Sequence, residues 1–250
     1  MVGTRRVTGL LLMLGGLFYS AWLLEFLLAT DVSPVTSYVS ELGADGEPHA
    51  WLFRLGDTLA GLSLLVAGLV TLLARRRDGS TPRGELWMYR LLTIFGLCTV
   101  LDSSFPMSCV ATRDQACAVR EAAGRVPWTH LAHGVTSLLA GFALWGAFLV
   151  LLYRHPRRGC WIGRRGRRVL TVLFLGWMVA TGLTLAMQLP GVPGALLGLV
   201  QRAELLLSTG LLLVLGWRRF DSSTNLPPGA QQEPEVTAEA DRRPFAADRR

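Results

Sequence analysis

Residues 50–77 read AWLFRLGDTLAGLSLLVAGLVTLLARRR, and this stretch decides the fold of the chain. Its apolar part, 50–74, exceeds the roughly 20 residues that a helix needs to cross the hydrocarbon core of a bilayer. It ends abruptly in three arginines, which is how a span typically ends at a membrane surface. The stretch therefore predicts one transmembrane helix, with Asp57 as a carboxylate inside it.

Five further stretches of the same kind follow from the sequence. The six predicted spans are 7–28, 50–74, 86–104, 127–153, 168–189 and 194–217. A helix satisfies its own backbone hydrogen bonds, so it is the default structure in lipid. We therefore predict an all-α polytopic membrane protein, a bundle of six transmembrane helices over 1–220. Residues 221–250 are rich in Pro, Glu, Ala and Arg, and they predict a disordered cytoplasmic tail.

Composition agrees with a membrane protein. The 250 residues are 51% hydrophobic, and the mean hydropathy is +0.38, both high for a soluble domain. The net charge of +7 does not indicate a nucleic-acid partner, because the positions of the arginines explain it. They alternate between successive connectors, so the positive-inside rule places both termini in the cytoplasm of a cell-membrane protein. An uncleaved first span fits its length and its Glu25 better than a signal peptide does.

The basic connector 154–168 could also bind a partner. It carries seven arginines, and each one near an anionic surface gains about 1 kcal/mol. Anionic lipid head groups are thus a candidate partner there, besides the bilayer itself. The alternative is that these arginines only fix the topology.

Two of the four cysteines lie in the same predicted outer connector. Seven residues separate Cys109 from Cys117, and an outer compartment permits oxidation. We expect a disulfide between them. Neither Cys98 nor Cys160 has an evident partner, and the chain has no CxxC pair that would indicate a thiolate zinc site.

Ionisable residues inside the spans are the candidates for function, because each costs about 2.5–3.5 kcal/mol at the centre of an inserted helix. Asp57 lies three residues after Arg54 on one helical face, so the two could simply pair. Asp102 ends the third span beside a proline. In the last span, Arg202 could neutralise Asp57 or Glu204.

Histidines mark the start of the fourth span. His130, His133 and Ser137 share one helical face, and two histidines one turn apart can bind a metal such as zinc or transfer protons. Hydrogen bonding to a neighbouring helix is the structural alternative. Most polar residues lie in the outer halves of their spans, which predicts a polar cavity open to the outer face. The candidate lining residues are Ser40, Arg54, Ser137, Gln201, Arg202 and Glu204.

One stretch of the outer connector carries a family resemblance. Residues 37–43, SYVSELG, followed by Pro48, 51–57 (WLFRLGD) and Gly61, resemble the bacterial and archaeal membrane family called domain of unknown function 998. Weaker likenesses lie at 102–106, His133-x-x-x-Ser137 and Gln201-Arg202. The resemblance implies an integral membrane protein of six or seven helices and no established activity. A distant analogy with alkaline-ceramidase and adiponectin-receptor-like hydrolases is limited by the absence of their HxxxH pattern on a last helix.

Three functions stay open, so the sequence leaves undecided whether the protein is an enzyme. The leading hypothesis is a non-catalytic membrane or envelope component whose polar residues hold helices together. A metal-dependent lipid hydrolase is the second, with His130 and His133 as ligands, His49 or Asp102 completing the set. Asp57 or Glu41 would be its general base. The third is a small transporter or lipid-binding protein.

Overall fold

The computed structural model describes residues 2–78, 83–154, 164–186 and 196–221. Every regular element in these ranges is helical, so the all-α prediction is confirmed. The elements are α1 (Val2–Tyr19), η1 (Ala21–Phe26), η2 (Val39–Gly43), α2 (Ala50–Asp78), α3 (Arg83–Ser104), α4 (Gln115–Ala122), α5 (Trp128–Arg154), α6 (Arg164–Ala186) and α7 (Leu197–Asp221). The predicted tail lies outside the described residues, apart from Asp221, and so does most of the basic connector.

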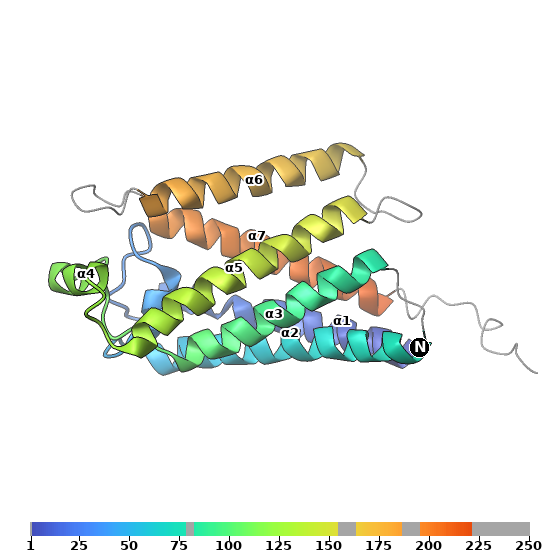
Figure 1. The fold of residues 1–250 in the computed structure, drawn as a ribbon, viewed down its shortest axis with the longest axis horizontal. Helices are drawn as coiled ribbons and strands as arrows, with labels where there is room; N and C mark the ends of the chain where they lie inside the picture. The colour runs from blue at the N-terminus through green and yellow to red at the C-terminus, as the bar shows by residue number, and fades with distance from the viewer. Residues whose placement is uncertain (1, 79–82, 155–163, 187–195, 222–250) are drawn as a thin grey trace, which may run out of the picture.

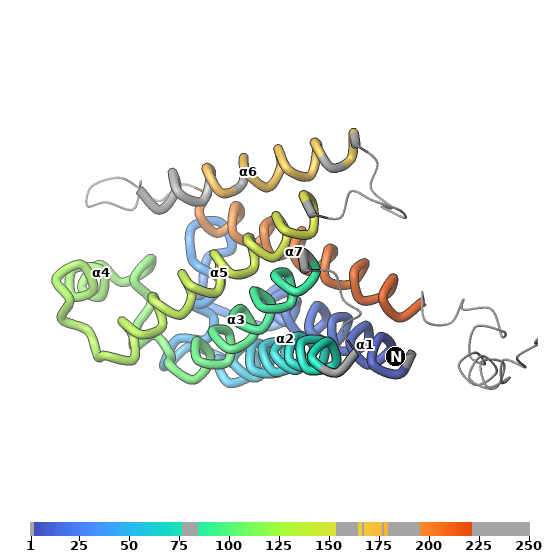
Figure 2. Tube along the Cα trace, turned by 45° about the vertical axis from the view of Figure 1, so that its right-hand side comes forward, coloured from blue at the N-terminus to red at the C-terminus, as the bar shows by residue number. Residues whose placement is uncertain are grey.

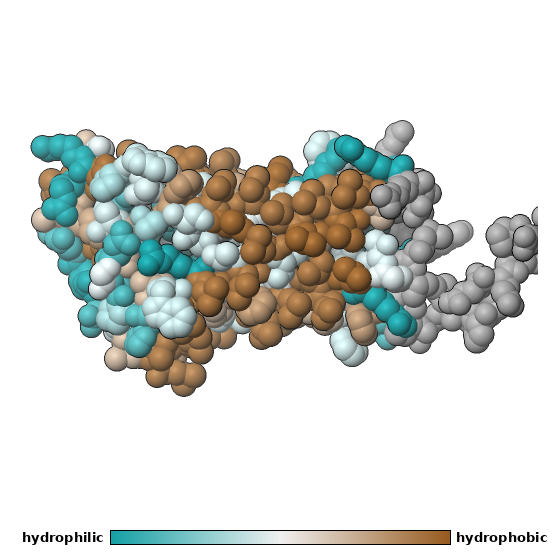
Figure 3. Space-filling view, turned by 90° about the horizontal axis from the view of Figure 1, so that it is seen from below, coloured by the Kyte–Doolittle hydropathy of each residue, from teal (hydrophilic) through white to brown (hydrophobic). Residues whose placement is uncertain are grey.

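Five helical stretches among the described residues are long and apolar enough to cross a membrane. They are Gly3–Phe26, Ala50–Arg76, Glu85–Ser104, Trp128–Tyr153 and Leu197–Asp221. Many of their apolar side chains face outward, as a lipid-facing surface requires. Figure 3 shows the result on one face: an apolar belt with hydrophilic residues gathered toward the ends. The chain is therefore a membrane protein.

The helices pack in an order that differs from their order in the chain. Neighbours run α5, α3, α2, α1 and α7, so the first and last helices lie side by side. Helix α6 packs mainly on α7 and lies at the edge of the bundle (Figures 1 and 2). Among the described residues, the backbones of α5 and α7 approach each other at few places, and the side chains of Trp145 and Glu204 connect the two helices.

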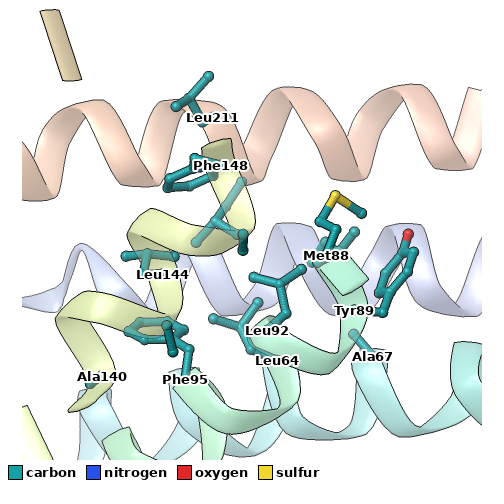
Figure 4. Close-up of a cluster of buried hydrophobic side chains, with 14 of the residues drawn as sticks. Leu64, Ala67, Met88, Tyr89, Leu92, Phe95, Ala140, Leu144, Phe148 and Leu211 are labelled. Carbon is teal, nitrogen blue, oxygen red and sulfur yellow. The ribbon is translucent and has the colours of Figure 1, made fainter. Parts of the chain in front are cut away.

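The core lies where α2, α3, α5 and α7 meet. Tyr89, Phe95 and Phe148 are its largest fully enclosed side chains, and Leu12 of α1, Leu64 and Leu212 pack with them (Figure 4 shows most of this cluster). Small residues let the helix backbones approach. A Cβ at Gly61 would lie 2.7 Å from the carbonyl oxygen of Gly96, and Gly9 and Gly216 meet equally closely. Such contacts are the usual means of close helix association in lipid.

Two elements at one end differ from the prediction. The first span does not continue as one α-helix to residue 28, because α1 ends at Tyr19 and η1 follows as a 3-10 helix. The connector after α3 contains α4, whose N-terminus is capped by Asp114, since its side chain accepts from the backbone N–H of Ala116. We call η1, η2, α4 and the connecting residues 27–38, 44–49, 105–114 and 123–127 the cap, and this end of the bundle the cap end.

Candidate functional site

A buried ion pair ties the first membrane segment to the last. Arg202 of α7 donates two hydrogen bonds of 2.6 Å to the two carboxylate oxygens of Glu25 in η1. The side chains are only 5% and 1% exposed. The guanidinium also donates to the backbone carbonyls of Ser37 and Gly198. The expectation that Arg202 neutralises Asp57 or Glu204 is therefore wrong.

Glu41 is the second buried anchor of the cap. Its carboxylate accepts from the backbone N–H groups of Tyr38 and Thr112 and from the Thr112 hydroxyl. Burial raises the pKa of the Glu41 carboxyl above its ordinary value, although these hydrogen bonds act in the opposite direction. With its acceptors occupied and its side chain fully enclosed, Glu41 joins two cap segments and is badly placed to serve as a general base.

The remaining cap contacts are at the rim. Arg54 pairs with Asp45 at 3.3 Å, both partly exposed, so it does not pair with Asp57 as its helical spacing allowed. Gln201 accepts from the backbone N–H of Val39 at 2.7 Å. Ser40 lies against the sulfur of Met107, 3.8 Å away.

Cys109 and Cys117 form a disulfide, with a Cα–Cα distance of 6.1 Å. It links the start of the α3–α5 connector to α4, next to the point where Thr112 binds Glu41. The cap is thus held by one covalent bond and by two buried carboxylates.

His133 is held by the end of α3. Its Nδ1 atom lies 3.1 Å from the backbone carbonyl oxygen of Asp102 and 3.0 Å from that of Phe105. Both partners only accept, so Nδ1 carries the proton and Nε2 of a neutral ring is an acceptor. That Nε2 atom is buried without a hydrogen-bond partner in the described part of the chain. The side chain as a whole is about nine-tenths buried.

His130 carries its proton on the other ring nitrogen. Its Nδ1 atom accepts from the backbone N–H of Ser108 at 3.1 Å, which places the proton of a neutral ring on Nε2. The Nε2 atom lies 3.7 Å from a carboxylate oxygen of Glu121. The two histidines are one turn apart, yet they are held differently. His133 donates to backbone carbonyls and keeps an acceptor nitrogen, whereas His130 accepts from Ser108 and keeps a donor N–H.

The described residues contain no group of three or more His, Cys, Asp or Glu side chains that could hold a metal ion. His49 does not join the other two histidines, since it lies exposed at the start of α2 with a positive φ of 60°. The structure therefore does not assemble the predicted zinc ligands His49, His130 and His133.

Three carboxylates of the spans form an interior group. Asp57 of α2, Asp102 of α3 and Glu204 of α7 all lie within electrostatic range of the Tyr19 hydroxyl of α1. Asp102 accepts from the hydroxyls of Thr136 and Ser137 at 2.6 and 2.8 Å. Glu204 accepts from the indole N–H of Trp145. We call Asp57, Asp102 and Glu204 the interior carboxylates.

Asp57 differs from the other two. It shares the inward face of α2 with Phe53 and Ala60, which are buried, whereas Trp51 and Leu55 are exposed on the opposite face. Its carboxylate takes part in none of the ion pairs among the described residues, and its side chain is half-buried and not enclosed. Asp102 lies within electrostatic range and repels it.

Several of these residues escape sequence reasoning. Glu25 was noted only as a charge in the first span, and Thr112, Trp145 and Tyr19 carry no pattern that marks them. Glu25 alone had a usable signal, because a carboxylate in an apolar run requires a partner.

The chain belongs to the family described as "Protein of unknown function (DUF998)", which matches residues 13–218. The resemblance seen in residues 37–61 is thereby confirmed. No curated protein and no solved structure matches the chain. The family defines a class of helical membrane protein and leaves its activity open.

Proposed function

We propose that this chain is a non-catalytic six-span membrane protein that binds a cationic group among its interior carboxylates. The cap faces the outside, and both termini are cytoplasmic. The sixth span is α6, whose residues 169–186 are almost entirely apolar. This proposal joins two hypotheses from the sequence, a non-catalytic membrane component and a lipid-binding protein.

The arginines support the orientation. Arg5 and Arg6 begin α1, and Arg75–Arg77 end α2, all at the end opposite the cap. The cap contains a disulfide, which forms and persists in oxidising compartments. Positive-inside bias and disulfide thus point the same way.

Asp57 is the observation that carries the binding proposal. A carboxylate on the interior face of a membrane helix is costly without a partner. Both nearby arginines are committed elsewhere, Arg202 to Glu25 and Arg54 to Asp45. A ligand cation would supply the missing charge and would also relieve the repulsion from Asp102.

The unfilled atoms define the chemistry of that cation. Asp57 offers carboxylate oxygens, and Nε2 of His133, whose ring is bound to the Asp102 backbone, offers a lone pair. Both are acceptors, so the fitting ligand is a donor. A protonated amine with N–H bonds meets both needs, whereas a quaternary ammonium brings charge without donors. An amine on an alkyl chain could also reach this depth from the bilayer.

Hydrolysis is less well supported. The metal ligands are not assembled, and Glu41 and Asp102 already accept two or more hydrogen bonds each. A general base needs a free acceptor close to a reacting proton. These carboxylates instead hold segments together.

Dodecylammonium binding tests the proposal. The purified full chain in a neutral maltoside detergent would be titrated calorimetrically with dodecylammonium, dodecyltrimethylammonium and dodecanol. We expect saturable binding of the primary amine, weaker binding of the quaternary one and none of the alcohol. Asp57→Asn should weaken amine binding at least about tenfold, because a hydrogen bond to a charged group contributes about 1.5–3 kcal/mol.

Asp31→Asn is the matched control, since Asp31 is an exposed cap residue and loses the same charge. It should leave binding unchanged. Equal affinity of Asp57→Asn and the unaltered chain would refute the site, and no saturable amine binding would refute the function.

A further inference from the structure

Arginines from α1 and α2 meet at the end opposite the cap. The hydroxyls of Thr8 and Thr71 lie 3.1 Å apart in a buried contact between these helices. Arg5 is three residues before Thr8, and Arg75 is four residues after Thr71. Since residues three or four apart share a helix face, both arginines lie one turn beyond this contact. Arg75 is half-buried there, whereas Arg5 is exposed at the rim.

A third arginine completes the group. Arg219 of α7 lies with its guanidinium carbon 5.2 Å from the ring centre of Tyr89 and pairs with Glu85 of α3. Arg5 and Arg219 are both within electrostatic range of the Tyr89 hydroxyl. Glu85 pairs with Arg219, so this carboxylate does not neutralise Arg5 or Arg75.

Arg75 shows directly that an acceptor is missing. Its Nη1 atom is buried and has no hydrogen-bond partner in the described ranges. No carboxylate among those residues forms an ion pair with Arg5 or Arg75. A buried N–H without an acceptor is destabilising, and more so when the group is charged. The geometry therefore calls for an anion between α1 and α2.

The depth of this position identifies the kind of anion. Trp87 of α3 and Trp217 of α7 are exposed at the same end, at 50% and 61%, and Arg90 stacks on Trp87 at 4.8 Å. Exposed tryptophans beside arginines are typical of the lipid head-group level. Phospholipids carry their phosphate groups at that level, and a guanidinium binds a phosphate through two parallel hydrogen bonds.

We propose that Arg5 and Arg75 bind the phosphate of an anionic phospholipid in the leaflet at this end of the bundle. This site is independent of the interior carboxylates, which lie toward the cap. It also differs from the basic connector 154–168, most of which lies outside the described residues.

Lipid-dependent thermal protection tests the site. The delipidated full chain in neutral detergent would be heated with increasing phosphatidylglycerol, with phosphatidylcholine or with inorganic phosphate. We expect protection by phosphatidylglycerol alone. Arg75→Gln should raise its half-saturating concentration at least about tenfold, the factor that corresponds to one hydrogen bond between charged groups.

Arg76→Gln is the matched control. Arg76 is the next residue of the same helix, but it is exposed, so it removes the same charge at the same depth. It should raise the half-saturating concentration by about fivefold at most, the general effect of one arginine at an anionic surface. An equal effect of Arg75→Gln and Arg76→Gln would overturn the site in favour of general surface charge.

Two further arms keep the test decisive. Equal protection by inorganic phosphate would overturn the lipid as the ligand and indicate free phosphate. If Arg75→Gln does not fold, Arg75→Lys and Arg5→Gln carry the comparison, since each removes part of the guanidinium pair. Unchanged affinity in both would overturn the proposal.

Discussion

Replacing Arg202 by methionine should destabilise the protein strongly. The substitution removes both 2.6 Å bonds to Glu25 and leaves a carboxylate that is 1% exposed without a counter-charge. Removing one partner of a buried ion pair costs about 3–5 kcal/mol. The loss of the bonds to Ser37 and Gly198 acts in the same direction.

The assay is reversible unfolding of the detergent-solubilised protein by increasing amounts of a denaturing detergent, followed by tryptophan fluorescence. Arg54→Met is the control, because Arg54 and its partner Asp45 are 33% and 56% exposed. Exposed pairs contribute only about 0–1 kcal/mol. Similar losses for Arg202→Met and Arg54→Met would refute the reasoning.

A double variant separates the pair from its surroundings. Glu25→Gln combined with Arg202→Met removes both charges, so its cost should be clearly smaller than the sum of the two single costs. Strict additivity would mean that the two residues act independently, contrary to their geometry.

Three further predictions concern the cap and the orientation. Cys117→Ser should cost about 2.5 kcal/mol, the loop-closure value for so short a loop, and reductant should destabilise the unaltered chain but not this variant. Burial raises the pKa of the Glu41 carboxyl, so the folded protein keeps this proton to a higher pH than the unfolded chain does. The free energy of unfolding should therefore decrease as the pH rises through the window just above 4.5. Thermal unfolding of Glu41→Gln should lack that fall, and an identical pH profile would contradict the assignment. In intact cells, a membrane-impermeant maleimide should label Ser33→Cys and spare Gly3→Cys, both in a Cys160→Ser background; the reverse pattern would invert the topology.

Helix faces could be predicted from the sequence, but helix neighbours could not. The spacing of Arg54 and Asp57 correctly places them near each other on α2, yet Arg54 turns to Asp45 in the cap, where both charges stay hydrated. Arg202 pairs with Glu25, which lies 177 positions earlier in the chain. Partner choice depends on the packing order of the helices, and local periodicity does not contain that order.

The histidines illustrate the same limit. Their shared face is correct, since both lie buried on the inward side of α5. What a ring can bind depends on which nitrogen is already occupied. That is decided by the Asp102 carbonyl at the end of α3 and by Phe105 and Ser108 in the connector, which has no periodic pattern. The 3-10 helix η1 could not be predicted either, because the apolar run 7–28 has no sequence feature that marks the change from α-helix to 3-10 helix.

The Glu25–Arg202 pair can form only after the last helix has been synthesised. Glu25 enters the bilayer with the first helix, while its partner is made only with the last. During synthesis the nascent chain therefore carries an uncompensated carboxylate through every earlier insertion step, at a cost in lipid. A chain truncated before Arg202 would therefore keep the Glu25 carboxylate without the counter-charge that it has in the complete fold.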